Sequence, residues 1–265
     1  MLTIDVNPML FHLGPLAVSW YGLAVATGVI VGVWLTLREA RRKGIPTEPV
    51  ADLVVWVILG GFVGARLLHV IDRWDFYSVN PGQILAIQNG GLAILGAVLG
   101  GTLAGAIGAV RGGLPVRRLS DAAAPGLVLG QAIGRFGCLI TGDALGPPTD
   151  GTWGIVYRNP GAMAPQLGVA YQPTFFYEQL WDVLVFALLW SLRKRLAGDG
   201  RLFALYLALY AVGKFALTFL RNETVWLLGL QEAQLLALGT LLVAIGWAAW
   251  GGGRRVPTPA ARASS

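Results

Sequence analysis

The sequence predicts an all-α membrane protein with seven transmembrane helices, and three observations carry this prediction. Of the 265 residues, 55% are hydrophobic and only 13% are charged. The mean hydropathy is +0.63. A water-soluble domain of this size has too little interior to bury so much apolar surface. Ten-residue segments of alternating polarity, which are typical of outer-membrane barrels, do not occur in the sequence.

Seven stretches are long and apolar enough to cross a bilayer, which takes about 20 residues in a helix. The predicted spans lie at about 17–37, 50–71, 92–110, 122–141, 175–192, 202–220 and 234–250. Two longer connections remain, at about 72–91 and about 142–174. The first carries Trp74, Phe76 and Tyr77, aromatic residues that suit the headgroup level. The second is rich in Pro with short apolar runs, and it predicts a small folded cap.

The distribution of Lys and Arg predicts the orientation of these spans. Fourteen lie in the connections after the first, third and fifth spans and in the C-terminal tail: Arg38, Arg41, Arg42, Lys43, Arg111, Arg117, Arg118, Arg193, Lys194, Arg195, Arg201, Arg254, Arg255 and Arg262. The opposite side carries three: Arg73, Arg158 and Arg221. Cytoplasmic loops are enriched in Lys and Arg, so we expect the N-terminus outside and the C-terminus in the cytoplasm. The net charge of +6 is then an orientation signal, and we expect no nucleic-acid partner.

The predicted organisation is a single membrane domain followed by a short tail. The domain covers residues 1–253 and carries the cap, at about 142–174, on its outer face. The tail, residues 254–265, is rich in Arg, Pro, Ala and Ser, and we expect it to be disordered and cytoplasmic. The single cysteine excludes an intramolecular disulfide and a thiolate metal cluster, and two histidines leave little for zinc. We therefore expect chemistry without a metal or a cofactor.

Three cationic side chains, Arg66, Arg135 and Lys214, fall inside predicted spans, where ionised groups are costly and usually mark a site. Counted from the cytoplasmic side at 1.5 Å per residue, each lies roughly 20 to 24 Å along its helix, in the outer half of the bilayer. Tyr21 lies about a turn below the outer surface. Three cations at one depth predict a bound anion. The alternative for Arg66, Lys214 and Arg221 is snorkelling to the outer headgroups.

Arg135 is the strongest of these candidates because of its neighbours. It follows Gly126, Gly130 and Gly134 and precedes Gly137. Small residues at this spacing let helices approach closely, so we expect Arg135 to be buried in protein rather than exposed to lipid. A guanidinium has the fork geometry that matches a phosphate or a carboxylate. At this depth, the phosphate of a phospholipid headgroup is the simplest such anion.

Four further residues keep two interpretations each. His69 lies on the same helical face as Arg66 and could titrate near neutral pH, or it could be an interfacial histidine bonded to a loop. Cys138 is either a small packing residue near the site or a nucleophile. Glu178 and Asp182, one turn apart, fit either a charge preference at a helix start or a polar site.

The stretch from Gly134 to Gly146, GRFGCLITGDALG, resembles the signature of the bacterial prolipoprotein diacylglyceryl transferases. In that family Gly-Arg-x-Gly-Asn is followed by a polar residue, Gly, an acid and a terminal Gly. The resemblance extends over nearly the whole chain, with further matching motifs at Trp20-Tyr21-Gly22, Gly64-Ala65-Arg66, Asn89 to Ile94, Gln172-Pro173-Thr174, Tyr177-Glu178 and Leu220-Arg221. Seven spans with an outside N-terminus are also typical of that family.

The resemblance implies transfer of the diacylglyceryl group from phosphatidylglycerol to the lipobox cysteine of a preprolipoprotein, at the outer leaflet of the bacterial cytoplasmic (inner) membrane. This is the first step of lipoprotein maturation. Carried over by position, Arg135 would hold the phosphate, Tyr21 would be an essential polar contact and Asp143 would match the motif's acid. The implied substrate-binding set also includes Gly134, Gly137, Cys138, Gly146, Arg66, Lys214, Arg221, Tyr177, Glu178 and His69. The implied partners are phosphatidylglycerol, preprolipoprotein signal peptides and the membrane.

This chain departs from the family pattern where a base for the thiol would lie. Many members carry His, and others Tyr, where this chain has Leu95, and the motif's Asn is Cys138. The family's sixth helix has Arg and, four residues later, Glu, whereas this chain has Lys214 and Thr218. We therefore expect phosphate binding to be preserved, while the proton acceptor is open. The candidate substitutes are His69, Asp143 and Glu178.

Two other function classes compete with the transferase hypothesis. The first is a diverged, non-catalytic relative that binds phospholipid or a lipoprotein precursor, which the departures at Leu95, Cys138 and Thr218 motivate. The second is an anion transporter. A transporter needs polar residues along its whole path, and the inner halves of these spans are nearly all apolar.

Overall fold

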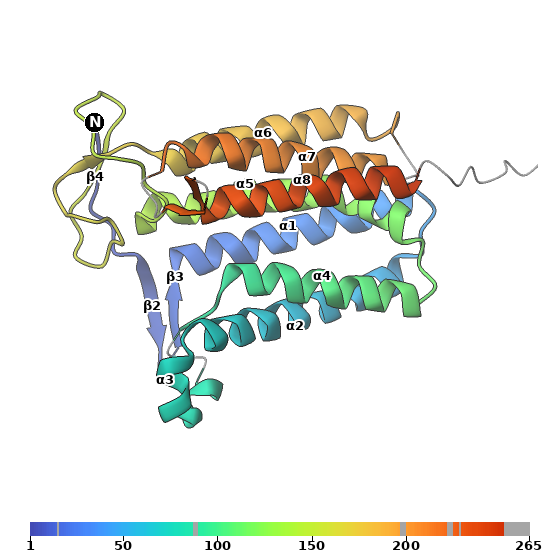
Figure 1. Cartoon of the computed structure of the whole chain (residues 1–265), viewed down its shortest axis with the longest axis horizontal. Coiled ribbons are helices and arrows are strands. Elements are labelled where there is room, and N and C mark those ends of the chain that lie inside the picture. The colour runs from blue at the N-terminus through green and yellow to red at the C-terminus, as the bar shows by residue number, and fades with distance from the viewer. Residues whose placement is uncertain (15, 87–89, 197–199, 222–224, 228, 252–265) are drawn as a thin grey trace, which may run out of the picture.

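The computed structural model describes most of the chain and shows a bundle of long helices (Figure 1). The described residues are 1–14, 16–86, 90–196, 200–221, 225–227 and 229–251. The predicted tail, 254–265, lies outside the described residues. Within them, seven helices are long and apolar enough to cross a membrane. They are α1 (Trp20–Arg42), α2 (Thr47–Asp72), α4 (Ile94–Arg111), α5 (Val116–Thr141), α6 (Thr174–Leu192), α7 (Arg201–Thr218) and α8 (Glu232–Gly251).

These helices confirm the seven predicted spans, and the differences lie at their ends. The first span, predicted from about residue 17, begins at Trp20, because Leu16–Ser19 form strand β3 and the Ser19 hydroxyl accepts the first-turn N–H of Gly22 at 3.0 Å. Several basic residues that we placed in loops lie within helices, at or near their ends, instead: Arg38, Arg41, Arg42, Arg111, Arg117, Arg118 and Arg201. Helices therefore run further into the basic end than hydropathy alone predicts.

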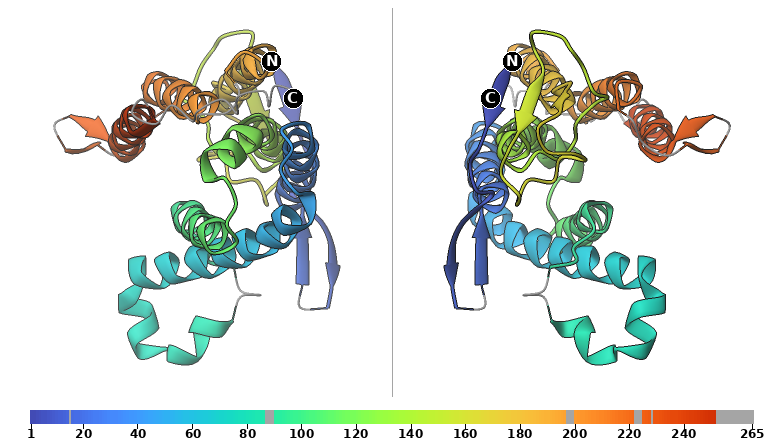
Figure 2. Two further views of the ribbon diagram at one scale, coloured as in Figure 1. Left: turned by 90° about the vertical axis from the view of Figure 1, so that its right-hand side faces the viewer. Right: turned by 90° about the vertical axis from the view of Figure 1, so that its left-hand side faces the viewer.

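The helices form two groups when the bundle is seen end-on (Figure 2). In one group, α5 packs along α1 and α6, and α7 packs along α8. In the other group, α2 packs along α4. The α2–α4 and α1–α5 pairings depend on glycine, since small residues allow close backbone approach between membrane helices. A Cβ atom on Gly64 would lie 2.3 Å from the carbonyl oxygen of Gly96.

The predicted glycine stripe on α5 is confirmed in part. A Cβ atom on Gly28 of α1 would lie 2.6 Å from the Gly130 carbonyl oxygen, and one on Gly32 would lie 2.8 Å from that of Gly126. The third member of the stripe, Gly134, has nothing within 4 Å of its Cβ position. Two of the three glycines therefore serve the α1–α5 contact, and this part of the prediction is wrong for Gly134.

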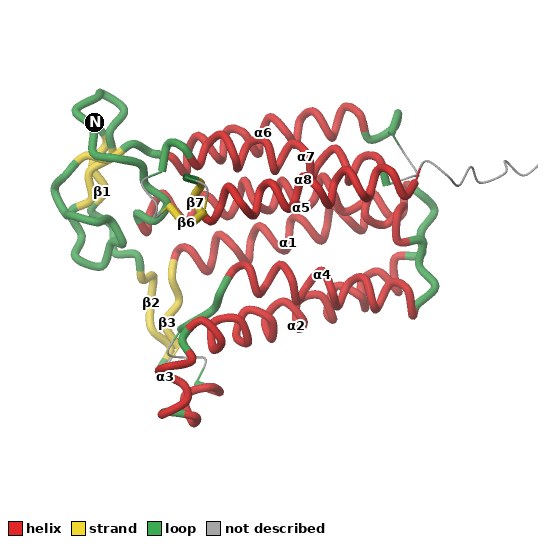
Figure 3. The backbone as a smooth tube through the Cα atoms, viewed as in Figure 1, coloured by secondary structure: helices red, strands yellow, loops and turns green. Residues whose placement is uncertain are grey.

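Short strands gather at the end of the bundle where the N-terminus lies (Figure 3). Strands β1 (Leu2–Ile4), β4 (Ile155–Tyr157) and β5 (Ala170–Tyr171) form one sheet, with β1 parallel to β4 and β4 antiparallel to β5. Strands β4 and β5 belong to the connection between α5 and α6, which we call the cap (residues 142–173), and β1 adds to them from the N-terminus. Local sequence patterns did not reveal that the N-terminal strand joins the cap.

Two hairpins and one short helical segment complete this end. The hairpins pair β2 (Met9–Leu13) with β3, and β6 (Val225–Leu227) with β7 (Leu230–Gln231). Between α2 and α4 lie α3 (Trp74–Val79) and the 3₁₀ helix η1 (Pro81–Leu85), which we call the α3–η1 segment. In the part of the chain that the structure describes, the fold is therefore mostly helical and the strands lie at the capped end.

Candidate functional site

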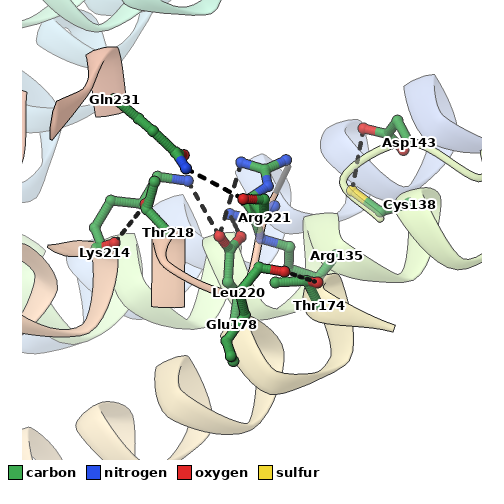
Figure 4. Close-up of polar contacts among 10 residues, drawn as sticks. All are labelled: Arg135, Cys138, Asp143, Thr174, Glu178, Lys214, Thr218, Leu220, Arg221 and Gln231. Carbon is green, nitrogen blue, oxygen red and sulfur yellow. Dashed lines mark hydrogen bonds and ion pairs between the residues drawn. The ribbon is translucent and has the colours of Figure 1, made fainter. Parts of the chain in front are cut away.

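Four charged side chains from α5, α6, α7 and the residues after α7 meet near the capped end (Figure 4). Glu178, in the second turn of α6, pairs with Arg135 of α5, and its other carboxylate oxygen lies 3.2 Å from Lys214 Nζ and 3.9 Å from Arg221 Nη1. The Glu178 side chain is only 5% exposed. We call these four residues the Glu178 cluster. Of the two interpretations of Glu178, a charge preference at a helix start or a polar site, these contacts favour the polar site.

Cationic side chains gather around the Glu178 carboxylate. Asp182, one turn further along α6, is 7% exposed and interacts electrostatically with Arg135. Among the described residues, three cations therefore lie close to two carboxylates, and Arg221 makes a further interaction. In a site of low dielectric, cations held together attract an anion strongly.

Asp143 lies on the other side of Arg135, where α5 ends. Gly142 adopts a left-handed conformation (φ 72°) and its N–H donates to the Cys138 carbonyl, which ends the helix and turns the chain back. The Asp143 carboxylate accepts a hydrogen bond from Thr141 Oγ1 at 2.5 Å and one from Cys138 Sγ at 3.5 Å. Arg135 also interacts with the Cys138 sulfur. The motif residues Arg135, Cys138 and Asp143 are therefore brought together.

Tyr21 reaches the same corner because Gly137 has no side chain. A Cβ atom on Gly137 would lie 2.8 Å from both Cα and Cδ2 of Tyr21. The Tyr21 phenol interacts electrostatically with Cys138, Asp143 and Arg135. The predicted polar contact from the first span thus faces the Gly134–Gly146 motif.

Gly146, the last glycine of the motif, joins three segments. A Cβ atom there would lie 2.7 Å from the Leu220 carbonyl oxygen and 2.7 Å from Thr174 Oγ1. Thr174 begins α6, and Leu220 precedes Arg221. Gly146 therefore allows the cap to pack against the residues that carry Glu178 and Arg221. This geometry gives Gly146 a packing role, and its part in substrate binding stays a prediction.

The cap is fixed to α5 by a buried tyrosine. Tyr157 of β4 is 0% exposed and donates its hydroxyl hydrogen to the Leu139 carbonyl at 2.8 Å. Burial raises the pKa of the Tyr157 phenol, and the nearby Asp143 and Cys138 raise it further. The phenol therefore stays protonated as a donor. Neither Tyr157 nor Thr141 was singled out by sequence reasoning, although Thr141 lies within the motif.

Arg66 does not join the Glu178 cluster. Its guanidinium donates to five backbone carbonyl oxygens of the α3–η1 segment and the residues after it, those of Gln83, Ile84, Ala86, Gly90 and Gly91, at 2.6 to 3.5 Å. The guanidinium also lies 5.3 Å from the centroid of the Tyr77 ring. His69 packs its ring edge-on against Tyr77 at 5.9 Å. We call Arg66, His69 and Tyr77 the Arg66 group.

The structure also locates three further residues that the sequence analysis discussed. Tyr177 is half-buried and precedes Glu178, and Leu95 lies in the first turn of α4. Thr218, where the family has a carboxylate, is fully buried and donates to the Lys214 carbonyl at 2.6 Å. Thr218 thus offers no carboxylate to Lys214, which pairs with Glu178 on the neighbouring helix α6 instead.

Comparison with known proteins agrees with the motif. Residues 8–250 match the family model described as prolipoprotein diacylglyceryl transferase. The chain is 39% identical to a Trichormus variabilis protein over 262 residues (96% of this chain, 92% of the relative) and 40% identical to one from Bacillus cereus over 244 residues (91% and 90%). A Lysinibacillus sphaericus protein is 35% identical over 252 residues (93% and 92%). All three relatives are named phosphatidylglycerol–prolipoprotein diacylglyceryl transferase. The chain belongs to the prolipoprotein diacylglyceryl transferase family.

Proposed function

We propose that this protein transfers the diacylglyceryl group of phosphatidylglycerol to the lipobox cysteine of preprolipoproteins. The observation that carries this proposal is the Glu178 cluster, in which three cations surround one carboxylate inside a membrane protein. The family membership supports the same activity. Together they indicate a site for an anionic headgroup beside the motif residues.

The cluster supplies the binding site for the phosphodiester. Arg135 offers a planar fork that can bind two phosphate oxygens at once, while Lys214 offers a point charge. Arg221, which follows α7, completes the positive surface. Glu178 holds these cations in place before the lipid arrives, so little reorganisation is needed on binding.

The reaction is a displacement at the glycerol carbon that carries the phosphate. The substrate thiol loses its proton, because the thiolate is the nucleophile. A carbon–sulfur bond forms and the carbon–oxygen bond to the phosphate breaks, which gives a thioether and glycerol phosphate. Negative charge develops on the leaving phosphate oxygens, and the preorganised cations stabilise it.

The distribution of basic residues supports a location in the bacterial cytoplasmic membrane with the site toward the outer leaflet. The basic ends of α1 and α4 and the basic residues that follow α6 lie opposite the cap, and cytoplasmic loops are enriched in Lys and Arg. Residues 1–253 then form one membrane domain whose cap faces outside. Preprolipoproteins emerge on this face, where the lipobox cysteine can reach the Glu178 cluster.

Complementation tests this proposal against its alternative, a non-catalytic relative that binds phospholipid or precursor. The gene is expressed in a bacterium whose own transferase is depleted. We expect precursor lipoproteins to gain the diacylglyceryl group and growth to be restored. The exposed cap variant Arg158→Ala serves as the matched control and should behave as wild type. Unmodified precursors despite good expression would favour the non-catalytic alternative, which the departures at Leu95, Cys138 and Thr218 motivate.

A further inference from the structure

The geometry points to Asp143 as the group that takes the proton from the incoming cysteine thiol. This inference rests on the proposed function and assigns the base that this chain needs. The Asp143 carboxylate already accepts a hydrogen bond from a thiol, since Cys138 Sγ lies 3.5 Å from its Oδ2 atom. A general base must lie within hydrogen-bond reach of the proton that it removes.

Asp143 is also held in one orientation at the edge of the site. The Thr141 hydroxyl donates to its Oδ1 atom at 2.5 Å, and the left-handed Gly142 fixes the turn between them. The Asp143 residue is half-buried, so a substrate can approach it. Each carboxylate oxygen has two lone pairs, so both oxygens can accept a further donor. The carboxylate is thus oriented and available.

The other acidic groups and the histidine are less suited to this role. Glu178 is engaged by three cations and is 5% exposed. Asp182 lies one turn deeper in the bundle and is 7% exposed. His69 belongs to the Arg66 group, next to Tyr77. Among the candidates in the described residues, Asp143 combines a thiol contact, partial exposure and proximity to Arg135.

The substrate thiol gives its proton to a carboxylate oxygen of Asp143, and its sulfur forms a bond to the glycerol carbon. The electrons of the breaking carbon–oxygen bond leave with the phosphate, which Arg135 holds. The proton on Asp143 then passes to the departing glycerol phosphate or to water. No oxidant or further reactant is required.

A selenocysteine peptide tests this step with purified full-length protein. Phosphatidylglycerol is supplied with lipobox peptides that carry either cysteine or selenocysteine. A selenol is ionised at neutral pH, so it needs no base. In Asp143→Asn we expect turnover of the cysteine peptide to fall about 10²-fold or more, the usual contribution of a general base. Turnover of the selenocysteine peptide should stay near the wild-type rate.

Controls separate proton transfer from other effects. Asp143→Glu keeps the carboxylate and should recover part of the activity on the cysteine peptide. Asp150→Asn removes an exposed carboxylate from the same cap and should leave both peptides unaffected. Arg135→Ala removes a phosphate ligand and should slow both peptides equally.

The outcomes distinguish this inference from the proposed function. A loss of equal size with both peptides in Asp143→Asn, or no loss with either, would overturn the assignment of Asp143. Selective loss with the cysteine peptide supports it. A wild-type protein that modifies neither peptide would instead refute the proposed function, and the inference with it.

Discussion

Arg66 and Arg135 both lie toward the capped end of a membrane-spanning helix, but their guanidinium groups have different partners. Arg66 donates to five backbone carbonyl oxygens, so every N–H of the guanidinium is used. Arg135 shares the carboxylate of Glu178 with Lys214 and Arg221. The first arginine fixes a loop. The second lies with Lys214 and Arg221 around one carboxylate, and it is suited to bind an anion.

The difference shows that depth along a helix locates a buried cation but does not identify its partner. Sequence counting placed Arg66, Arg135 and Lys214 at one level and predicted one anion site. The structure assigns Lys214 to the Glu178 cluster and Arg66 to the α3–η1 segment.

The replacement Arg135→Ala should give the largest loss. Removing one charged donor from a preorganised site costs about 10²- to 10³-fold in turnover, and here it also removes the fork for the phosphate. We expect thermal unfolding in detergent to remain cooperative, because α5 still packs on α1 through Gly126 and Gly130. Transfer to a lipobox peptide is the measurement. Turnover close to wild type would remove Arg135 from the mechanism.

The replacement Glu178→Gln should lower stability more than any single change in the Arg66 group. Removing one partner of a buried ion pair costs about 3–5 kcal/mol, because the remaining charges are left uncompensated. In this variant Arg135, Lys214 and Arg221 would repel one another. Thermal unfolding of the purified protein measures the effect. An unchanged unfolding temperature would show that the cations do not depend on this carboxylate.

A matched pair of glycine variants tests the contact that places Tyr21 beside the motif. Gly137→Ala puts a methyl group 2.8 Å from the Tyr21 Cα atom, and such overpacking costs about 1–3 kcal/mol. Gly134→Ala, in the same helix, meets nothing within 4 Å and should be neutral or stabilising by up to about 1 kcal/mol. Thermal unfolding of both variants is the comparison. Equal effects would contradict the close α1–α5 approach.

Arg66→Gln should release the α3–η1 segment without weakening lipid binding. The five carbonyl oxygens that Arg66 satisfies would be left to water or to other donors. We expect faster amide hydrogen exchange in residues 74–86 and unchanged affinity for phosphatidylglycerol. Loss of lipid affinity with normal exchange in this segment would move Arg66 into the phosphate site and remove the contrast with Arg135.

His69→Gln should have the smallest effect. The His69 ring packs against Tyr77, within the Arg66 group. We expect turnover and its dependence on pH to match those of the wild type. A lost or displaced limb in the profile of rate against pH would assign His69 to proton transfer and weaken the case for Asp143.

Composition and charge predicted the fold well, because burial in lipid requires long apolar helices. The motif also placed Arg135, Cys138 and Asp143 together, since they lie within three turns of one helix end. The strand pairing of Leu2–Ile4 with Ile155–Tyr157 was not predictable, because it joins segments about 150 residues apart with no local signal. The pairing of Glu178 with Lys214 also joins two different helices, so no local sequence pattern predicted it.

A structure of the protein with bound phosphatidylglycerol tests the central claim most directly. We predict that the lipid phosphate lies within hydrogen-bond distance of Arg135 and beside Lys214, with the glycerol carbon facing Asp143. A phosphate bound at Arg66, or an Arg135 side chain turned away from the lipid headgroup, would contradict the account.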